Sequence, residues 1–246
     1  MPEDPLLPPH GGYRNLLSFR SAQLAYDLTT RFCDRFIDKK SRTHDQMVQA
    51  ARSGVQNIAE GSQASGTSKK FELKLTNVAR ASLEELRLDF EDYLRHRRLP
   101  QWPPDHPALR RFKGRRCACL ADVQDWVADE RRRARAEGRR EDKDPQGPTR
   151  TNNDDAQPSV SADALLGPLP GAWSLPVPGS PWGSLPPPVP AADTLAANAA
   201  LSILNLACYL LDRQVAAQAA AFAEEGGFTE RLYRIRSQNR TRPPKR

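Results

Sequence analysis

Cysteine and histidine are scarce in this chain of 246 residues, which has four of each. The cysteines show no disulfide framework, and one residue separates Cys117 from Cys119, whereas zinc knuckles use about two to four. The histidines lie far apart and outside any H-E-x-x-H pattern. The proline-rich N-terminus shows no secretory signal, so we expect reduced thiols in a cytoplasmic protein that has no metal and no cofactor.

Patterns typical of catalysis are also missing. The sequence has neither a P-loop nor a dinucleotide-binding glycine pattern. Two carboxylate pairs, Glu84–Glu85 and Glu91–Asp92, are candidates for a di-metal site, but no histidine follows at the Glu-x-x-His spacing that such a site requires. Surface salt bridges are the simpler interpretation of both pairs. We therefore expect no catalytic residues, and a bound metal or nucleotide in purified protein would argue for an enzyme instead.

Hydrophobic residues make up only 38% of the chain and prolines number 22, so a substantial part is expected to stay outside any packed core. The segments concerned are a disordered leader at 1–13, a disordered Pro/Gly-rich linker at 142–192 and a basic tail at 238–246. The linker contains Trp173 and Trp182 among prolines, which is compatible with either a spacer or a polyproline-type docking segment.

Four stretches repeat apolar residues at helical spacings of three and four: residues 14–39, 43–60, 68–97 and 192–225. The third has the longest stripe, formed by Leu75, Ala79, Leu83, Leu86, Phe90 and Leu94. A stripe of that length requires partners of similar length. The sequence therefore predicts an all-α protein, an antiparallel up-down four-helix bundle that consists of residues 14–99 and 193–237.

Helix boundaries follow from turn and capping residues. Thr43 is the expected N-cap of the second helix, Ser68 or Thr67 of the third, and Asp193 or Thr194 of the fourth. Gly61, Ser65, Gly66 and Ser68 indicate the turn between the second and third helices. Gly226 and Gly227 are expected to end the fourth helix, before a short further helix. Residues 100–141 are expected to be a charged helical extension, broken near Gly114.

The fourth helix carries no charge from Thr194 to Leu211, so a membrane span is an alternative to a buried helix. Its alanines and its polar residues Asn198, Ser202 and Asn205 favour a helix buried on several sides. Its broad apolar surface also suits a contact between subunits.

Several motifs resemble those of a known family. NIAEG at 57–61, Phe71-Glu72, ARASLEEL at 79–86, and AANAALSILNLACYLLDRQ with EEGGFTERLYRIR within 196–236 are similar to the four-helix-bundle proteins encoded in intervening sequences of bacterial 23S rRNA genes. The resemblance is to the four helix bundle suffix branch, which is related to diversity-generating retroelement accessory proteins. The family-motif residues, with an expected structural role, are Asn57, Glu60, Gly61, Glu72, Ser82, Glu85, Gly226 and Gly227.

This resemblance implies a bacterial, non-enzymatic protein that forms homo-oligomers, with a pentamer as one expected form, and that presents a basic surface to nucleic acid. A reverse transcriptase would be a partner only if the protein belonged to a retroelement. The net charge of +7 agrees with an acidic partner such as RNA or DNA. The candidate nucleic-acid-binding residues are Lys69, Lys70, Arg80, Arg87, Arg95, Arg97, Arg98, Arg231, Arg234 and Arg236.

The alternative function is that of a purely structural or protein-interaction bundle, in which the charges serve only solubility. The Arg-rich stretch at 131–141 also contains acids and is most simply a solvated face. RNA readers usually show aromatic stacking groups or a recognised module, and the sequence shows neither. Binding that falls with salt would favour phosphate contacts over this alternative.

Overall fold

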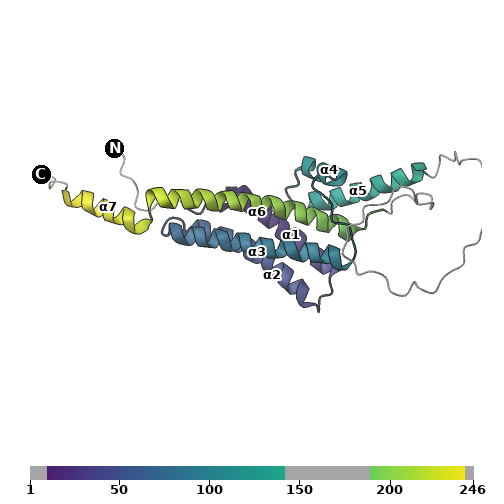
Figure 1. The fold of residues 1–246 in the computed structure, drawn as a ribbon, viewed down its shortest axis with the longest axis horizontal. Coiled ribbons are helices and arrows are strands. Elements are labelled where there is room, and N and C mark those ends of the chain that lie inside the picture. The colour runs from purple at the N-terminus through teal and green to yellow at the C-terminus, as the bar shows by residue number, and fades with distance from the viewer. Residues whose placement is uncertain (1–9, 142–188, 242–246) are drawn as a thin grey trace, which may run out of the picture. The chain divides into compact units, whose positions relative to one another are not determined.

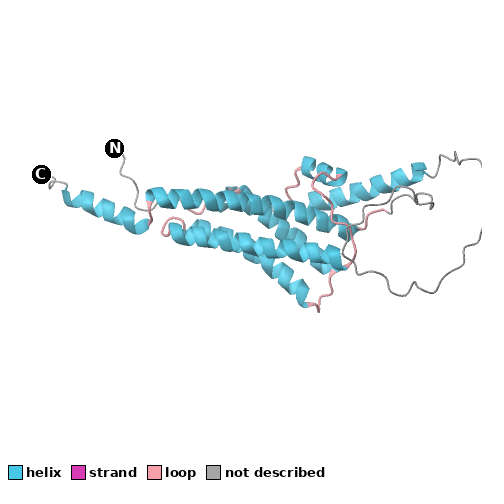
Figure 2. Ribbon diagram, in the orientation of Figure 1, coloured by secondary structure: helices cyan, strands magenta, loops and turns pink. Residues whose placement is uncertain are grey.

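The computed structural model describes residues 10–141 and 189–241, and within them every regular element is a helix (Figures 1 and 2). The order is η1 (Tyr13–Asn15), α1 (Leu17–Phe36), α2 (Arg42–Ala64), α3 (Lys69–His96), α4 (Pro107–Arg115), α5 (Leu120–Glu141), α6 (Ala192–Glu225) and α7 (Phe228–Thr241). The all-α prediction is confirmed for this part of the chain. The predicted leader, the linker and the end of the tail lie largely outside the described residues.

The chain divides into two compact units. The larger consists of residues 1–131 and 190–246, and the smaller of residues 132–189. The structure describes only the end of α5 and Val189 in the smaller unit.

Four helices, α1, α2, α3 and α6, form what we call the four-helix core, in which α1 and α3 each contact both α2 and α6. Two hydrogen bonds show that α3 and α6 are antiparallel. Tyr93 of α3 donates a hydrogen bond to Asp193 near the start of α6, at 3.1 Å, while Glu72 at the other end of α3 accepts one from Gln218 at 3.1 Å. The contacts therefore join residues up to 146 positions apart in the chain.

The centre of the larger unit is a single apolar cluster. Leu83 and Leu86 of α3 and Leu204 and Leu211 of α6 are fully buried in it. Phe32 of α1 meets the rings of Phe90 and Tyr93 edge-on, with centroids 5.0 and 4.7 Å apart. The apolar stripe read from the sequence of the third helix is thus its buried face.

Helix starts and stops agree with the sequence in some places and differ in others. Ser68 caps α3 by accepting a hydrogen bond from Phe71 N–H at 3.2 Å, as predicted. The prediction of Thr43 as cap of α2 was wrong, because α2 begins one residue earlier and Ser41 Oγ accepts from Thr43 N–H at 3.3 Å. Asp193 and Thr194 lie inside α6, which begins after Ala191 without a side-chain cap.

The position of Gly61 also differs from the prediction. The sequence places it in a turn, but α2 continues through it to Ala64, and Gly61 is buried. A Cβ atom at Gly61 would lie 3.3 Å from both Glu72 O and Leu75 Cβ of α3. The glycine therefore serves close helix packing rather than chain reversal, which takes place at Ser65–Ser68.

The charged segment after α3 contributes to the same apolar cluster. Ala108 and Phe112 of α4 and Val123 and Trp126 of α5 are buried in it, and the Phe112 and Trp126 rings meet at 4.9 Å. The break between these helices begins at Arg116, whose φ of 52° is left-handed, two residues after Gly114, near which it was predicted. Asp122 supports the start of α5 by accepting hydrogen bonds from the N–H groups of Ala118 and Cys119.

α6 is long and apolar enough to cross a membrane by length and composition, the one such helix among the described residues. Within the larger unit, however, 72% of its most apolar window is buried. The buried core helix of a globular protein meets the same criterion, so the composition of α6 is weak evidence for a membrane span.

Candidate functional site

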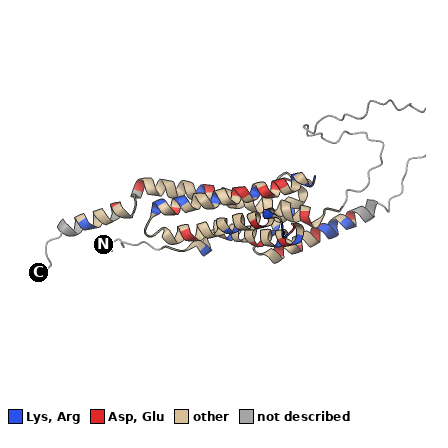
Figure 3. Cartoon of the chain, turned by 90° about the horizontal axis from the view of Figure 1, so that it is seen from below, with Lys and Arg blue, Asp and Glu red and all other residues tan. Residues whose placement is uncertain are grey.

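The basic residues predicted on α3 are mostly bonded to neighbouring acids. Arg87 bonds both Glu84 and Glu91, the latter at 2.6 Å, and Arg80 pairs with Asp212 of α6. Lys69 pairs with Glu72 at 3.4 Å and Arg95 with Asp92 at 2.5 Å. Accepting hydrogen bonds from Arg87 and Arg95 lowers the pKa of Glu84 and Asp92, respectively. Figure 3 accordingly shows basic and acidic positions interspersed along these helices.

The three remaining candidate cations in and beside α3 are Lys70, Arg97 and Arg98, and all three are exposed. The Arg97 guanidinium lies over the Tyr93 ring, 4.1 Å from its centroid, and donates hydrogen bonds to Tyr93 Oη and to Phe36 O of α1. Arg97 thus joins α3 to α1. Lys70 and Arg98 have exposed side chains, and they lie at opposite ends of α3. The α3 candidates therefore do not form one continuous cationic surface.

Arg231, Arg234 and Arg236 lie on α7, and charge of one sign dominates there. Residues 228–246 contain seven basic residues and one acid, Glu230. The Glu230 carboxylate accepts a hydrogen bond from Gly227 N–H at 2.9 Å. Tyr233, which is 75% exposed, stands among these arginines and was not predicted as a site residue. The sequence signal for it was its place inside the basic run.

Several of the family-motif residues lie at helix contacts or helix ends. Ser82 Oγ of α3 lies 2.9 Å from Ser53 Oγ of α2, and Asn57 donates to Ser53 O at 2.8 Å. Glu72 links α3 to Gln218 of α6, and Gly226, with φ of 72°, ends α6. Gly227 lies in the turn before α7, while Glu60 and Glu85 are exposed.

A cavity lined by residues of four helices, α1, α3, α4 and α6, was not predicted. It has a volume of about 780 Å³ and lies between the start of α1, α4 with its flanking loops, and α6, with Arg87 and Glu91 of α3 also lining it. We call it the α6 groove. Its apolar lining includes Leu24, Leu109, Phe112 and Leu201, which are buried, and Leu17, Leu206 and Tyr209, which are exposed. The sequence feature that could have indicated this groove is the broad apolar surface of the fourth helix.

Asn198 fixes one wall of the α6 groove. Its side chain is 1% exposed and bonds the loop after α3 in both directions. Nδ2 donates to Pro100 O at 3.0 Å, and Oδ1 accepts from Trp102 N–H at 2.8 Å. The Trp102 ring in turn stacks on His106, with centroids 4.3 Å apart. A polar residue inside an apolar helix therefore holds the loop that forms this wall.

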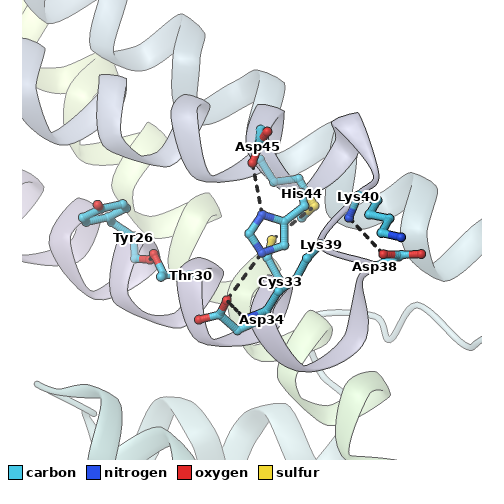
Figure 4. Close-up of polar contacts among 10 residues, drawn as sticks. Tyr26, Thr30, Cys33, Asp34, Asp38, Lys39, Lys40, His44 and Asp45 are labelled. Atoms are coloured by element: carbon cyan, nitrogen blue, oxygen red, sulfur yellow. Dashed lines mark hydrogen bonds and ion pairs between the residues drawn. The ribbon is translucent and has the colours of Figure 1, made fainter.

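A second polar cluster lies where α1 meets α2 (Figure 4). The His44 ring has Asp34 at 3.5 Å on one side and Asp45 at 3.4 Å on the other. Cys33 Sγ lies 3.9 Å from Met47 Sδ, and burial raises the pKa of the Cys33 thiol to about 12. A protonated, fully buried thiol is a poor nucleophile. We therefore interpret this cluster as a packing contact between α1 and α2 and not as a reactive site.

Comparisons with known proteins give no family assignment. A scan against protein-family models found no match, and searches of curated proteins and of solved structures also found none. The searched residues that the structure describes contain no group of three or more His, Cys, Asp or Glu residues arranged to hold a metal ion.

Proposed function

We propose that this protein is a non-enzymatic accessory protein that binds RNA through α7 and the basic residues after it. In this proposal the four-helix core is an up-down four-helix bundle of the kind that the motif resemblance implies, and the bundle self-associates. Phe71 and Val78 support self-association, because both are large, exposed and two helical turns apart on α3.

One observation carries the RNA proposal: positive charge is offset by acids on α3 and is in excess on α7. Phosphate contacts depend on Lys and Arg that displace counterions from the nucleic acid. An arginine that already bonds two carboxylates, as Arg87 does, contributes less to such binding. Residues 228–246, with seven cations to one acid, retain the required excess.

Exposed Tyr233 favours a single-stranded target over a duplex. Unpaired bases stack on aromatic side chains, and stacking contributes about 1–3 kcal/mol per base. Arg236, exposed and one helical turn from Tyr233, is placed to contact the adjacent phosphates. The same helix thus supplies a stacking group and cations.

The test is a salt titration of binding to a fluorescent single-stranded RNA. Replacing Arg234, Arg236 and Arg240 by Gln should weaken binding at low salt and should reduce the slope of log K against log salt by about 2, since each lost phosphate contact contributes about 0.7 on a single strand. The matched control replaces Arg52, Lys74 and Arg110, which are exposed, by Gln. An equal loss in both variants would show that only net charge matters.

The second candidate is a structural or protein-interaction bundle, favoured by the paired state of the α3 cations. It predicts a stable oligomer by light scattering together with no RNA binding at low salt. RNA binding that persists unchanged from low to high salt would argue against phosphate contacts and so against the first proposal.

A further inference from the structure

The α6 groove combines a buried apolar floor with exposed apolar edges. Leu24, Leu109, Phe112 and Leu201 are each no more than 6% exposed. At the edges, Leu17 and Tyr209 are 55% exposed and Leu206 is 46% exposed. Large apolar side chains that stay exposed beside a cavity of about 780 Å³ lose contact with water only when another molecule covers them.

The charged residues that line the groove are mainly basic. They are Arg20 of α1, Arg87 of α3, and Lys113 and Arg116 at the end of α4, with Glu91 as the single acid among the lining residues. Glu91 is bonded to Arg87 at 2.6 Å, so it does not offset the other three. Arg20 and Arg116 have exposed side chains. The groove is therefore apolar inside and positive at its edge.

The length of the groove matches a short helix. Its α6 side extends from Asn198 to Tyr209, which is about three helical turns or roughly 17 Å. A helix docked in a groove places anchors at i, i+3 or i+4, and i+7, which spans about two turns or roughly 11 Å and therefore fits within this length.

We propose that the α6 groove is the docking site for an acidic amphipathic helix of a partner protein. The apolar face of that helix would cover Leu206, Tyr209 and Leu17, and its flanking Asp and Glu residues would meet Arg20 and Arg116. The charge of the groove disfavours α7 of a second copy, which is itself basic. Nucleic acid fits poorly, because its charged phosphates cannot make apolar contacts with the floor of the groove. This proposal is independent of RNA binding by α7.

The experiment measures fluorescence anisotropy of labelled peptides against the full chain. The probe is an amphipathic peptide of about five turns with leucine at i, i+3, i+4 and i+7 and glutamate elsewhere. We expect it to bind at least tenfold more tightly than a peptide with lysine in place of each glutamate, and than a scrambled peptide of equal composition.

Two double variants separate the apolar and electrostatic parts. Leu206→Ser with Tyr209→Ser should weaken binding at least tenfold at low and high salt. Arg20→Glu with Arg116→Glu should weaken it about tenfold at low salt and much less at high salt, because exposed charges are screened. The matched control, Leu88→Ser with Arg52→Glu, changes exposed residues that do not line the groove and should leave binding unchanged.

Three outcomes would overturn the proposal. The first is equal binding of the acidic and basic peptides. The second is peptide binding that the groove variants leave unchanged while circular dichroism shows them folded. The third is a drop in molar mass by light scattering for Leu206→Ser with Tyr209→Ser, which would make the groove a contact between copies of this chain.

Discussion

The pKa of an individual carboxyl group in this protein depends on its burial and on the charged residues next to it. Asp89 of α3 is half-buried, and this desolvation, with smaller effects of Glu85 and Asp92, raises the pKa of its carboxyl from 3.8 to about 6. Asp92, three residues on, is exposed and has a lowered pKa because Arg95 donates a hydrogen bond to it. Two aspartates within one turn of a helix thus have opposite effects on stability.

We predict that Asp89→Asn stabilises the fold at pH 7.5 and has little effect at pH 4. Because the folded pKa exceeds the unfolded one, the native state binds more protons than the unfolded chain between about pH 4 and 6. The contribution of Asp89 to stability therefore falls as pH rises through this window and stays low above it. Discounted for solvent screening, the gain at pH 7.5 is about 1 kcal/mol.

Urea unfolding followed by circular dichroism at both pH values measures this difference. Glu60→Gln, which removes the same charge from an exposed site, is the control. A gain for Asp89→Asn of equal size at pH 4 and pH 7.5 would contradict the assignment to ionisation.

At the scale of elements, α2 and α3 approach closely because α2 has glycine at two positions that face α3. Gly54 and Gly61 of α2 both face α3, where Leu83 and Leu75 fill the space. Glycine in a helix interior costs roughly 1 kcal/mol relative to alanine, so its presence twice in one helix needs a compensating contact. Close packing against α3, together with the bond between Ser53 and Ser82, provides that contact.

We predict that Gly54→Ala destabilises the protein by about 1 kcal/mol or more, despite the better helix propensity of alanine. The added Cβ would lie 2.4 Å from Cδ2 and 2.7 Å from Cγ of Leu83, which is fully buried, so Leu83 or one of the helices would have to shift. Thermal unfolding measures the change.

The matched control is Gly114→Ala in α4, where an added Cβ meets nothing within 4 Å and helix propensity should act alone. A stabilised Gly54→Ala protein would mean that the two helices adjust at little cost. Non-additivity with Leu83→Ala would confirm that the clash involves this side chain.

At the scale of the whole molecule, one apolar cluster joins six helices of the larger unit. Residues of α1, α2, α3, α4, α5 and α6 all contribute buried side chains to it. Trp126 of α5, for example, belongs to the same cluster as Leu86 of α3. A destabilising substitution at one buried position should therefore destabilise all six helices of that unit together.

We predict that Leu86→Asp abolishes cooperative folding. Leu86 is fully buried, and an unpaired carboxylate there costs several kcal/mol, comparable to the total stability of a typical domain of about 5–15 kcal/mol. Helix content, measured by circular dichroism, and the native tryptophan emission spectrum should both be lost. Leu88→Asp on the same helix, where the side chain is 51% exposed, should remain folded.

The prediction of α3 from sequence succeeded because a long stripe and a strong cap are local signals. The expected Ser68–Arg97 differs from the observed Lys69–His96 by one residue at each end, and the expected Ala192–Glu225 matches α6. The end of α2 was placed too early because glycine usually stops a helix, and only contact with α3 explains why Gly61 does not. The α6 groove and the paired state of Arg80 could not be predicted, since both depend on residues distant in the chain.

The sequence alone determined which segments form helices and which face of each is apolar, since spacing, caps and glycines act within a few residues. It also determined that positive charge is in excess after residue 228. Only the tertiary structure decided that Arg80 pairs with Asp212, which aspartate is desolvated and where a groove stays open. Those properties arise between side chains that the chain brings together from far apart, as Asn198 and Trp102 are across 96 residues.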